Sequence, residues 1–162
     1  MEVFSLKILN MTFGSTAVIS QLRNKTQNLD LIQLHPVSKD ENDILLDLSN
    51  KKSPFHGGIS FEILSGTFLK KLNYYYSFSY LTLNTEEQKI FLTLFKQSNH
   101  SNIILARSLN HDFNYLLLSA WAKQDDFLIW SNTSPLLFNQ KYLNNPNYRA
   151  HTAIYESKND SF

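Results

Sequence analysis

Five histidines and the absence of cysteine define much of the side-chain chemistry open to this 162-residue chain. Imidazole binds metals and transfers protons near neutral pH. Four of the histidines fall in predicted loops or turns, or beside a proline or a glycine pair: His35, His56, His100 and His111. No two histidines have the spacing of a metal site, so a surface role is the preferred interpretation for these four. Without cysteine, disulfides, thiolate metal sites and thiol nucleophiles are excluded.

The remaining reactive side chains do not form a recognisable catalytic set. Asp125 and Asp126 fall in the first turn of a predicted helix, where the helix dipole favours negative charge. No partner acid or base lies near them in the sequence. The chain contains no Ser/His/Asp arrangement, phosphate-binding loop or carboxylate metal cluster. Alternating aromatic residues from Tyr74 to Tyr80 could stack a ligand, although cross-strand packing is the preferred interpretation.

The most informative stretch is Tyr115–Gln140, in which a strand leads into a broken helix. An apolar run predicts a buried strand that ends at Trp121. Phe127 and Trp130 then stand three apart, as neighbours on one helical face do, and Leu128 and Ile129 are expected to widen that apolar stripe. A second short helix is predicted to start at Ser134-Pro135, as a capping hydroxyl followed by a proline.

The composition predicts a packed, soluble and cytoplasmic protein. Hydrophobic residues make up 43% of the chain and aromatic residues 14%, which is enough for a packed interior. The net charge of +1 indicates neither a nucleic acid nor an anionic membrane as a partner. No apolar run approaches the ~20 residues of a membrane span. The first residues also lack the basic start and apolar core of a secretory signal.

Periodicity and capping signals predict an α+β fold. From Tyr74 onward the expected order is strand, helix, strand, strand, helix, strand, which is the split βαβ arrangement of ferredoxin-like domains. The predicted strands of this part are Tyr74–Leu83, Ile103–Leu109, Asn114–Trp121 and His151–Glu156, and its first helix is Thr85–Gln97. The earlier part is predicted to contain strands Val3–Leu9, Leu29–Leu34, Ile44–Leu48 and Ile59–Leu64, and a helix from Ser15 or Thr16 to Lys25 with Val18, Ile19 and Leu22 on its inner face.

Two halves follow from this order: residues 1–70, a β-rich half, and residues 71–162, the ferredoxin-like domain. The first half repeats the opening of the second, with a strand where a second helix is expected. A four-stranded sheet with both helices on one face needs cover on its other face. The N-terminal half could supply that cover within one chain, as an internal pseudo-dimer, or two chains could form a homodimer.

The strand ending in Trp121, followed by a helix carrying Phe127 and Trp130, resembles the antibiotic biosynthesis monooxygenase (ABM) family. The longer branch, which includes haem-degrading monooxygenases and the signal-transduction protein TRAP, is the most similar. Ser53–Phe68 also resembles the linking strand of that branch. The resemblance implies a ferredoxin-like domain of the dimeric α/β-barrel type, with a pocket between sheet and helices for an apolar, planar ligand such as haem.

The resemblance also places the candidate site residues. The pocket candidates are Ser79, Trp121, Phe127, Trp130 and Gln140. Gln140 stands where the haem-degrading branch has its iron-binding histidine, and Ser79 at or near the position of a pocket asparagine. An amide and a hydroxyl are poor replacements for these groups. His151 remains as an alternative iron ligand, and otherwise no metal site is expected.

Two main functions remain open at this stage. One is an oxygen-using enzyme that binds haem, or an aromatic substrate, in the ABM pocket. The other is a non-catalytic TRAP-like regulatory or stress-related protein that kept the fold and lost the chemistry. A third is a scaffold that binds no small molecule. In each case Trp121 and Trp130 are expected to be largely buried, so that Trp130→Ala should cost about 3–5 kcal/mol.

Overall fold

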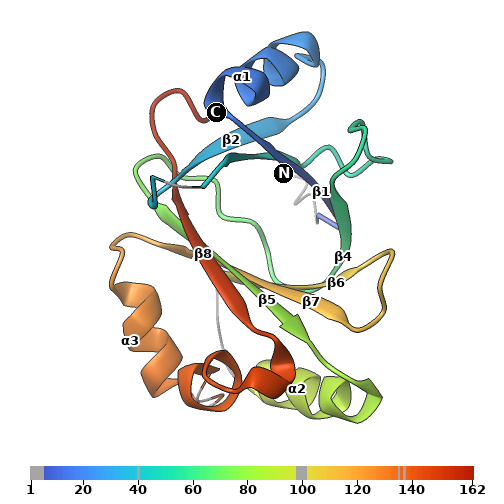
Figure 1. Ribbon diagram of the computed structural model, residues 1–162, viewed down its shortest axis with the longest axis vertical. Coiled ribbons are helices and arrows are strands. Elements are labelled where there is room, and N and C mark those ends of the chain that lie inside the picture. The colour runs from blue at the N-terminus through green and yellow to red at the C-terminus, as the bar shows by residue number, and fades with distance from the viewer. Residues whose placement is uncertain (1–5, 40, 98–101, 135, 137) are drawn as a thin grey trace, which may run out of the picture.

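Eight antiparallel strands close into a barrel in the order β1-β3-β2-β8-β5-β7-β6-β4 (Figure 1). The computed structural model describes residues 6–39, 41–97, 102–134, 136 and 138–162. The strands are β1 (Ile8–Gly14), β2 (Leu31–Pro36), β3 (Asp43–Asp47), β4 (Ile59–Ser65), β5 (Tyr75–Thr82), β6 (Ile103–Ser108), β7 (Asn114–Trp121) and β8 (His151–Glu156). The helices are α1 (Thr16–Lys25), α2 (Thr85–Gln97), α3 (Asp126–Thr133), the π-helical turn η1 (Asn139–Leu143) and the 3₁₀ turn η2 (Pro146–Tyr148).

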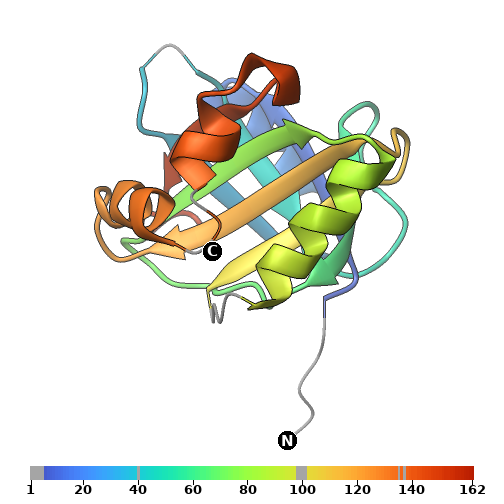
Figure 2. The same ribbon diagram turned by 90° about the horizontal axis from the view of Figure 1, so that it is seen from below.

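The C-terminal half has the predicted ferredoxin-like arrangement. Its strands lie in the order β8-β5-β7-β6, with α2 and α3 on the outer face of the sheet (Figures 1 and 2). β7 is a central strand, paired with β5 from Tyr75↔Trp121 to Thr82↔Asn114 and with β6 on its other side. The predicted α+β class and the central position of Asn114–Trp121 are confirmed.

The N-terminal half has the same strand order without the second helix. Its strands lie in the order β4-β1-β3-β2, so each half places its fourth strand beside its first and its third beside its second. The halves meet where β2 pairs with β8 and where β4 pairs with β6. We propose residues 1–70 and 71–162 as the two structural halves, because this boundary falls in the segment between β4 and β5, outside the strands of either half.

Three apolar clusters hold these layers together. The barrel interior takes side chains from both halves, among them Met11, Leu34, Phe78 and Tyr155. A second cluster fills the space between the C-terminal sheet and its helices, and a smaller one lies under α1. Phe78 and Tyr155 pack edge to face with ring centroids 5.2 Å apart. Cross-strand packing, the preferred interpretation of the aromatic column, is therefore confirmed for this part of β5.

Capping interactions explain where the first two helices begin. The Asn84 side chain accepts a hydrogen bond from the Glu87 backbone N–H at 2.9 Å, and the Glu87 side chain accepts one from Asn84 at 2.9 Å. This is the predicted capping box, with Asn84 as the cap. At α1 the Ser15 hydroxyl accepts from the Val18 N–H at 3.3 Å.

Two strands in the N-terminal half differ from the prediction. The first was expected at Val3–Leu9, of which residues 3–5 lie outside the described residues, but β1 begins at Ile8. It continues to Gly14 because it pairs along its length with β3 and β4. The second was expected to stop before His35-Pro36, but β2 includes both residues. Pro36 is tolerated since it ends the strand, opposite Tyr155 of β8.

The helix stripes are narrower than predicted. Leu128 and Ile129 are 49% and 59% exposed, so they do not widen the buried face of α3. Phe127 and Ser131, four residues apart, are its buried residues. A helix turns about 100° per residue, so positions 128 and 129 point away from the face shared by 127 and 131. Val18 on α1 was likewise expected inside and is 56% exposed.

The segment after α3 is less regular than the predicted second helix. Pro135 of the predicted Ser134-Pro135 start lies outside the described residues. The chain then forms η1 and η2, and Asn145 caps η2 by accepting a hydrogen bond from the Asn147 N–H at 3.0 Å. Arg149 follows with φ 47° and ψ 40°, the left-handed conformation. In the part of the chain that the structure describes, no helix is long and apolar enough to cross a membrane.

Candidate functional site

The structure brings together three of the predicted pocket residues. Trp121 ends β7, while Phe127 and Trp130 lie on α3. The Trp121 ring centroid lies 6.2 Å from that of Phe127 and 6.0 Å from that of Trp130, and the Phe127 and Trp130 centroids are 6.1 Å apart. These residues form an aromatic layer over the C-terminal sheet, at the place where the sequence predicts a ligand pocket.

Further aromatic side chains continue this layer beneath α2 and η1. The Phe138 ring lies 5.7 Å from Trp130 and 6.4 Å from Phe91, and Phe91 meets Tyr142 edge to face at 4.9 Å. Burial raises the pKa of Tyr142 to about 12. Sequence reasoning missed Phe138 and Tyr142, although their spacing of four residues was a signal for a shared helical face. The layer is thus packed with protein side chains.

The two tryptophans are partly buried and pack against the cluster between the C-terminal sheet and its helices. The Trp121 indole N–H donates to the Ser119 hydroxyl at 2.8 Å. Phe127 and Phe138, behind them, are 2% and 0% exposed. The tryptophans therefore form the solvent-facing rim of the aromatic layer. Trp130→Ala should consequently cost less than the 3–5 kcal/mol typical of a fully buried aromatic residue.

Ser79 and Gln140 lie in contrasting surroundings. Ser79 is fully buried in β5, and its hydroxyl hydrogen bonds that of Thr152 on β8 at 2.8 Å. Gln140 lies on η1 and is exposed. Neither residue presents the imidazole or pocket amide that the resemblance associates with haem turnover.

His151 lies across the sheet from the aromatic layer. Its ring stacks on Tyr80 with centroids 6.3 Å apart and an interplanar angle of 13°. Tyr80 packs against the barrel-interior cluster, whereas Thr152, the next residue along β8, bonds Ser79 on the helix side. Adjacent residues of a strand face opposite sides of the sheet, so His151 faces away from the aromatic layer.

Among the described residues, no group of three or more His, Asp or Glu side chains could hold a metal ion.

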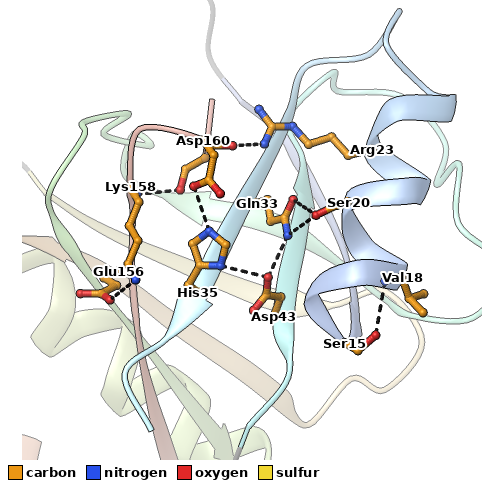
Figure 3. A network of polar contacts seen from close by, with 11 residues as sticks. Ser15, Val18, Ser20, Arg23, Gln33, His35, Asp43, Glu156, Lys158 and Asp160 are labelled. Carbon is orange, nitrogen blue, oxygen red and sulfur yellow. Dashed lines mark hydrogen bonds and ion pairs between the residues drawn. The ribbon is translucent and has the colours of Figure 1, made fainter. Parts of the chain in front are cut away.

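The most connected polar network in the N-terminal half surrounds His35 (Figure 3). His35 Nδ1 lies 3.0 Å from Asp43 Oδ2, and Nε2 lies 3.1 Å from Asp160 Oδ1. Gln33 Nε2 also donates to Asp43 Oδ2, at 2.8 Å. Hydrogen bonding by His35 holds the pKa of Asp160 below its usual value. The His35 side chain is only 13% exposed, so its predicted surface role is wrong, and it links β2, β3 and the C-terminal segment.

This network does not form a nucleophile–base pair. The Ser20 hydroxyl bonds the Gln33 side chain at 3.2–3.3 Å, not the His35 ring. Arg23 donates to the backbone carbonyl of Asp160, which ties α1 to the same segment. Acyl transfer requires a hydroxyl within hydrogen-bond reach of its base. The network therefore stabilises the junction of the two halves, and the aromatic layer remains the candidate site.

The chain forms a closed barrel of two ferredoxin-like halves, and this fold is similar to that of several solved structures. No protein-family model and no curated protein sequence matches the chain. Solved structures do match. A ferredoxin-fold protein related to antibiotic biosynthesis monooxygenases, from Listeria monocytogenes, has a TM-score of 0.72 and 21% identity, over 95% of this chain and 95% of that chain.

Two other neighbours differ in what they do. A haem-degrading enzyme from Listeria monocytogenes has a TM-score of 0.66 and 21% identity, over 93% of this chain and 99% of its own. A major regulator of staphylococcal pathogenesis has a TM-score of 0.74 and 9% identity, over 93% and 98% of the two chains. At these identities the likeness establishes the fold. The predicted resemblance to ABM proteins is confirmed at that level.

Proposed function

We propose that the protein is a non-catalytic ligand-binding relative of the ABM monooxygenases, and that its ligand is apolar and planar, with haem as the first candidate. The ligand would bind at the rim of the aromatic layer between the C-terminal sheet and α2 and α3. The fold shared with a haem-degrading enzyme supports the class of ligand.

The observation that carries this proposal is the half-buried Trp121–Trp130 pair. The two rings are tilted by 40° and lie in front of fully packed phenylalanines. Flat apolar ligands bind by covering aromatic faces of this kind and removing them from water. The rim thus offers apolar, planar contact area without requiring the interior of the layer to rearrange.

The donors in this region do not fit haem turnover. Gln140 offers an exposed amide in place of an imidazole, and the Ser79 hydroxyl is already bonded to Thr152. His151 lies on the opposite face of the sheet, against Tyr80. Since no described histidine accompanies the aromatic layer, we derive no iron-centred step, and binding without degradation is the expected behaviour.

The alternative is a TRAP-like regulatory protein that binds another macromolecule. The same lack of catalytic donors favours it, and a regulator of staphylococcal pathogenesis shares the fold over most of both chains. In that case the half-exposed tryptophans would contact a partner surface. In either case we propose that one chain acts as an internal pseudo-dimer, because both sheets of the barrel come from it. An obligate homodimer in sedimentation would contradict that arrangement.

A haemin titration separates these alternatives. We expect a saturable but broad Soret band that persists when ascorbate is added in air. Trp130→Ala should weaken the band, whereas Val18→Ala, an exposed apolar residue on α1, should leave it unchanged. Gln140→His should sharpen it by supplying an imidazole from an exposed position. Bleaching by the unmodified protein would establish catalysis instead, and a lack of saturation would favour the regulatory alternative.

A further inference from the structure

A cavity of about 340 Å³ lies at one end of the barrel. Its wall is formed where β5 and β6 end and where β4 and β7 begin, with Tyr80, Ser108, Phe61 and Asn114 among its residues. Phe61 and Tyr80 also pack with the barrel-interior cluster. The cavity therefore borders both the barrel interior and, through Leu81 and Tyr115, the helix side of the sheet, and it lies at the opposite end of β7 from Trp121.

The cavity wall is apolar at Ile59, Phe61 and Leu81 and carries two phenols, those of Tyr80 and Tyr115. Phe61 is 2% exposed. Burial raises the pKa of Tyr80, so its hydroxyl keeps its proton and acts as a donor. That hydroxyl is 3.9 Å from the sulfur of Met11, and a thioether is a weak acceptor. A ligand oxygen would be a better partner for this donor.

The rim of the cavity carries positive charge and amide groups. Arg149, His111, Asn110 and Asn114 line it, and no Asp or Glu among the described residues does so. Within the described part of the chain, no carboxylate forms an ion pair with Arg149. The nearby Arg107, by contrast, is paired with Glu62.

Arg149 is also held in an unusual backbone conformation. Its φ of 47° is one of three positive values at non-glycine residues in the described chain. Its backbone N–H donates to the Pro146 carbonyl at 3.2 Å, which closes η2 and fixes this residue where β8 begins. Left-handed backbone at a long side chain is uncommon and costs energy. Here it places a guanidinium without a carboxylate partner at the mouth of a cavity.

We propose that this barrel-end cavity binds a small aromatic carboxylate. The flat apolar part of the ligand would pack on Phe61 and Tyr80, and its carboxylate would accept hydrogen bonds from Arg149 at the rim. A guanidinium recognises a carboxylate through two parallel N–H donors, and a buried floor excludes water from the apolar part. The cavity volume is at the lower end of the usual range for small-molecule sites, which fits a single ring.

Calorimetric titration with benzoate, and with benzamide as its neutral counterpart, tests this site. We expect benzoate to bind at least about tenfold more tightly than benzamide. Added salt should lower the affinity for benzoate and leave the affinity for benzamide unchanged. Arg149→Asn should reduce benzoate affinity about tenfold or more, because asparagine tolerates the left-handed backbone but carries no charge. Lys123→Gln makes the same change in charge beyond the opposite end of β7 and should bind as the unmodified protein does.

Amide chemical shifts during the same titration locate the ligand without relying on a variant that folds. Shifts centred on Tyr80, His111 and Arg149 support the site. Equal affinity for benzoate and benzamide, unchanged affinity in Arg149→Asn, or shifts centred on Trp121 and Trp130 would overturn it. The cavity lies at the opposite end of β7 from Trp121, and haemin binding is measured separately from its Soret band. Failure of benzoate to bind would therefore leave the result of the haemin titration unaffected.

Discussion

Truncating Phe138 to alanine tests whether the aromatic layer is closed by packing. Phe138 is 0% exposed and meets rings from three elements: Phe91 of α2, Trp130 of α3 and Tyr142 of η1. Phe→Ala in a packed core costs about 3–5 kcal/mol, with the larger values where neighbours cannot collapse into the space. Since these neighbours are held by separate elements, we expect a loss in the upper part of that range.

The loss can be measured by thermal and urea unfolding. For a domain of this size, each kcal/mol shifts Tm by about 2–4 °C, so a loss of about 4–5 kcal/mol should lower Tm by roughly 8–20 °C. Leu128→Ala on α3 is the matched control, because Leu128 is 49% exposed. An exposed substitution of this kind should change the free energy of unfolding by no more than about 0.5 kcal/mol.

The same variant connects stability with binding. A cavity of one-ring size accepts a benzene-sized molecule and is too small for haem, so Phe138→Ala should leave haemin affinity at the tryptophan rim largely unchanged. An unchanged Tm would show that Phe138 does not close the layer. Much tighter haemin binding by this variant would show that the ligand enters the layer instead of covering its rim.

Three further substitutions test separate parts of the fold. Gly66→Ala should destabilise the protein by more than about 1 kcal/mol in urea unfolding, because φ is +100° and a Cβ would lie 2.1 Å from the Ile103 carbonyl oxygen. Asn84→Ala should cost about 1 kcal/mol by removing the side-chain half of the capping box, and Asn84→Ser should recover most of it. Asp160→Asn should flatten the acid side of the stability–pH profile. The folded-state pKa of Asp160 is lowered, so its contribution is present above the unfolded-state value and is lost as pH falls through the folded-state value.

Each of these has an outcome that contradicts it. Gly66→Ala with an unchanged urea midpoint would show that β4 and β6 can separate at this point without cost. Equal stability of the alanine and serine variants at position 84 would mean that the cap does not determine where α2 begins. For Asp160, the contribution is small since the side chain is 71% exposed, and parallel profiles of variant and unmodified protein would place the acid sensitivity elsewhere.

The C-terminal half could be predicted from the sequence because its signals are local. The capping box at Asn84 and the period-two alternation of β5 each depend on residues close together in the chain. β7 and β8 were predicted with their observed bounds for the same reason. The register of β1 was less accessible, since its pairing with β3 and β4 involves partners 29 to 54 residues away.

The candidate site was less predictable than the fold. Trp121, Phe127 and Trp130 were expected together and lie together. Phe138 and Tyr142, which complete the layer, belong to an irregular segment in which their four-residue spacing was the main local signal. The role of His35 was also hidden, because Asp160 is 125 residues away and Asp43 meets His35 only when β2 and β3 pair. The sequence showed which side chains could contribute to a site, but the contacts between them depend on the tertiary fold.

The repeated strand order has a consequence for how this barrel can change. In a barrel formed by two identical subunits, every substitution appears twice, at positions related by a two-fold axis. Here both sheets belong to one chain, so each substitution occurs once. One sheet could therefore lose its second helix and acquire the His35 network, while the other kept two helices and an aromatic layer. Covalent joining permits the two halves of a symmetric architecture to specialise independently.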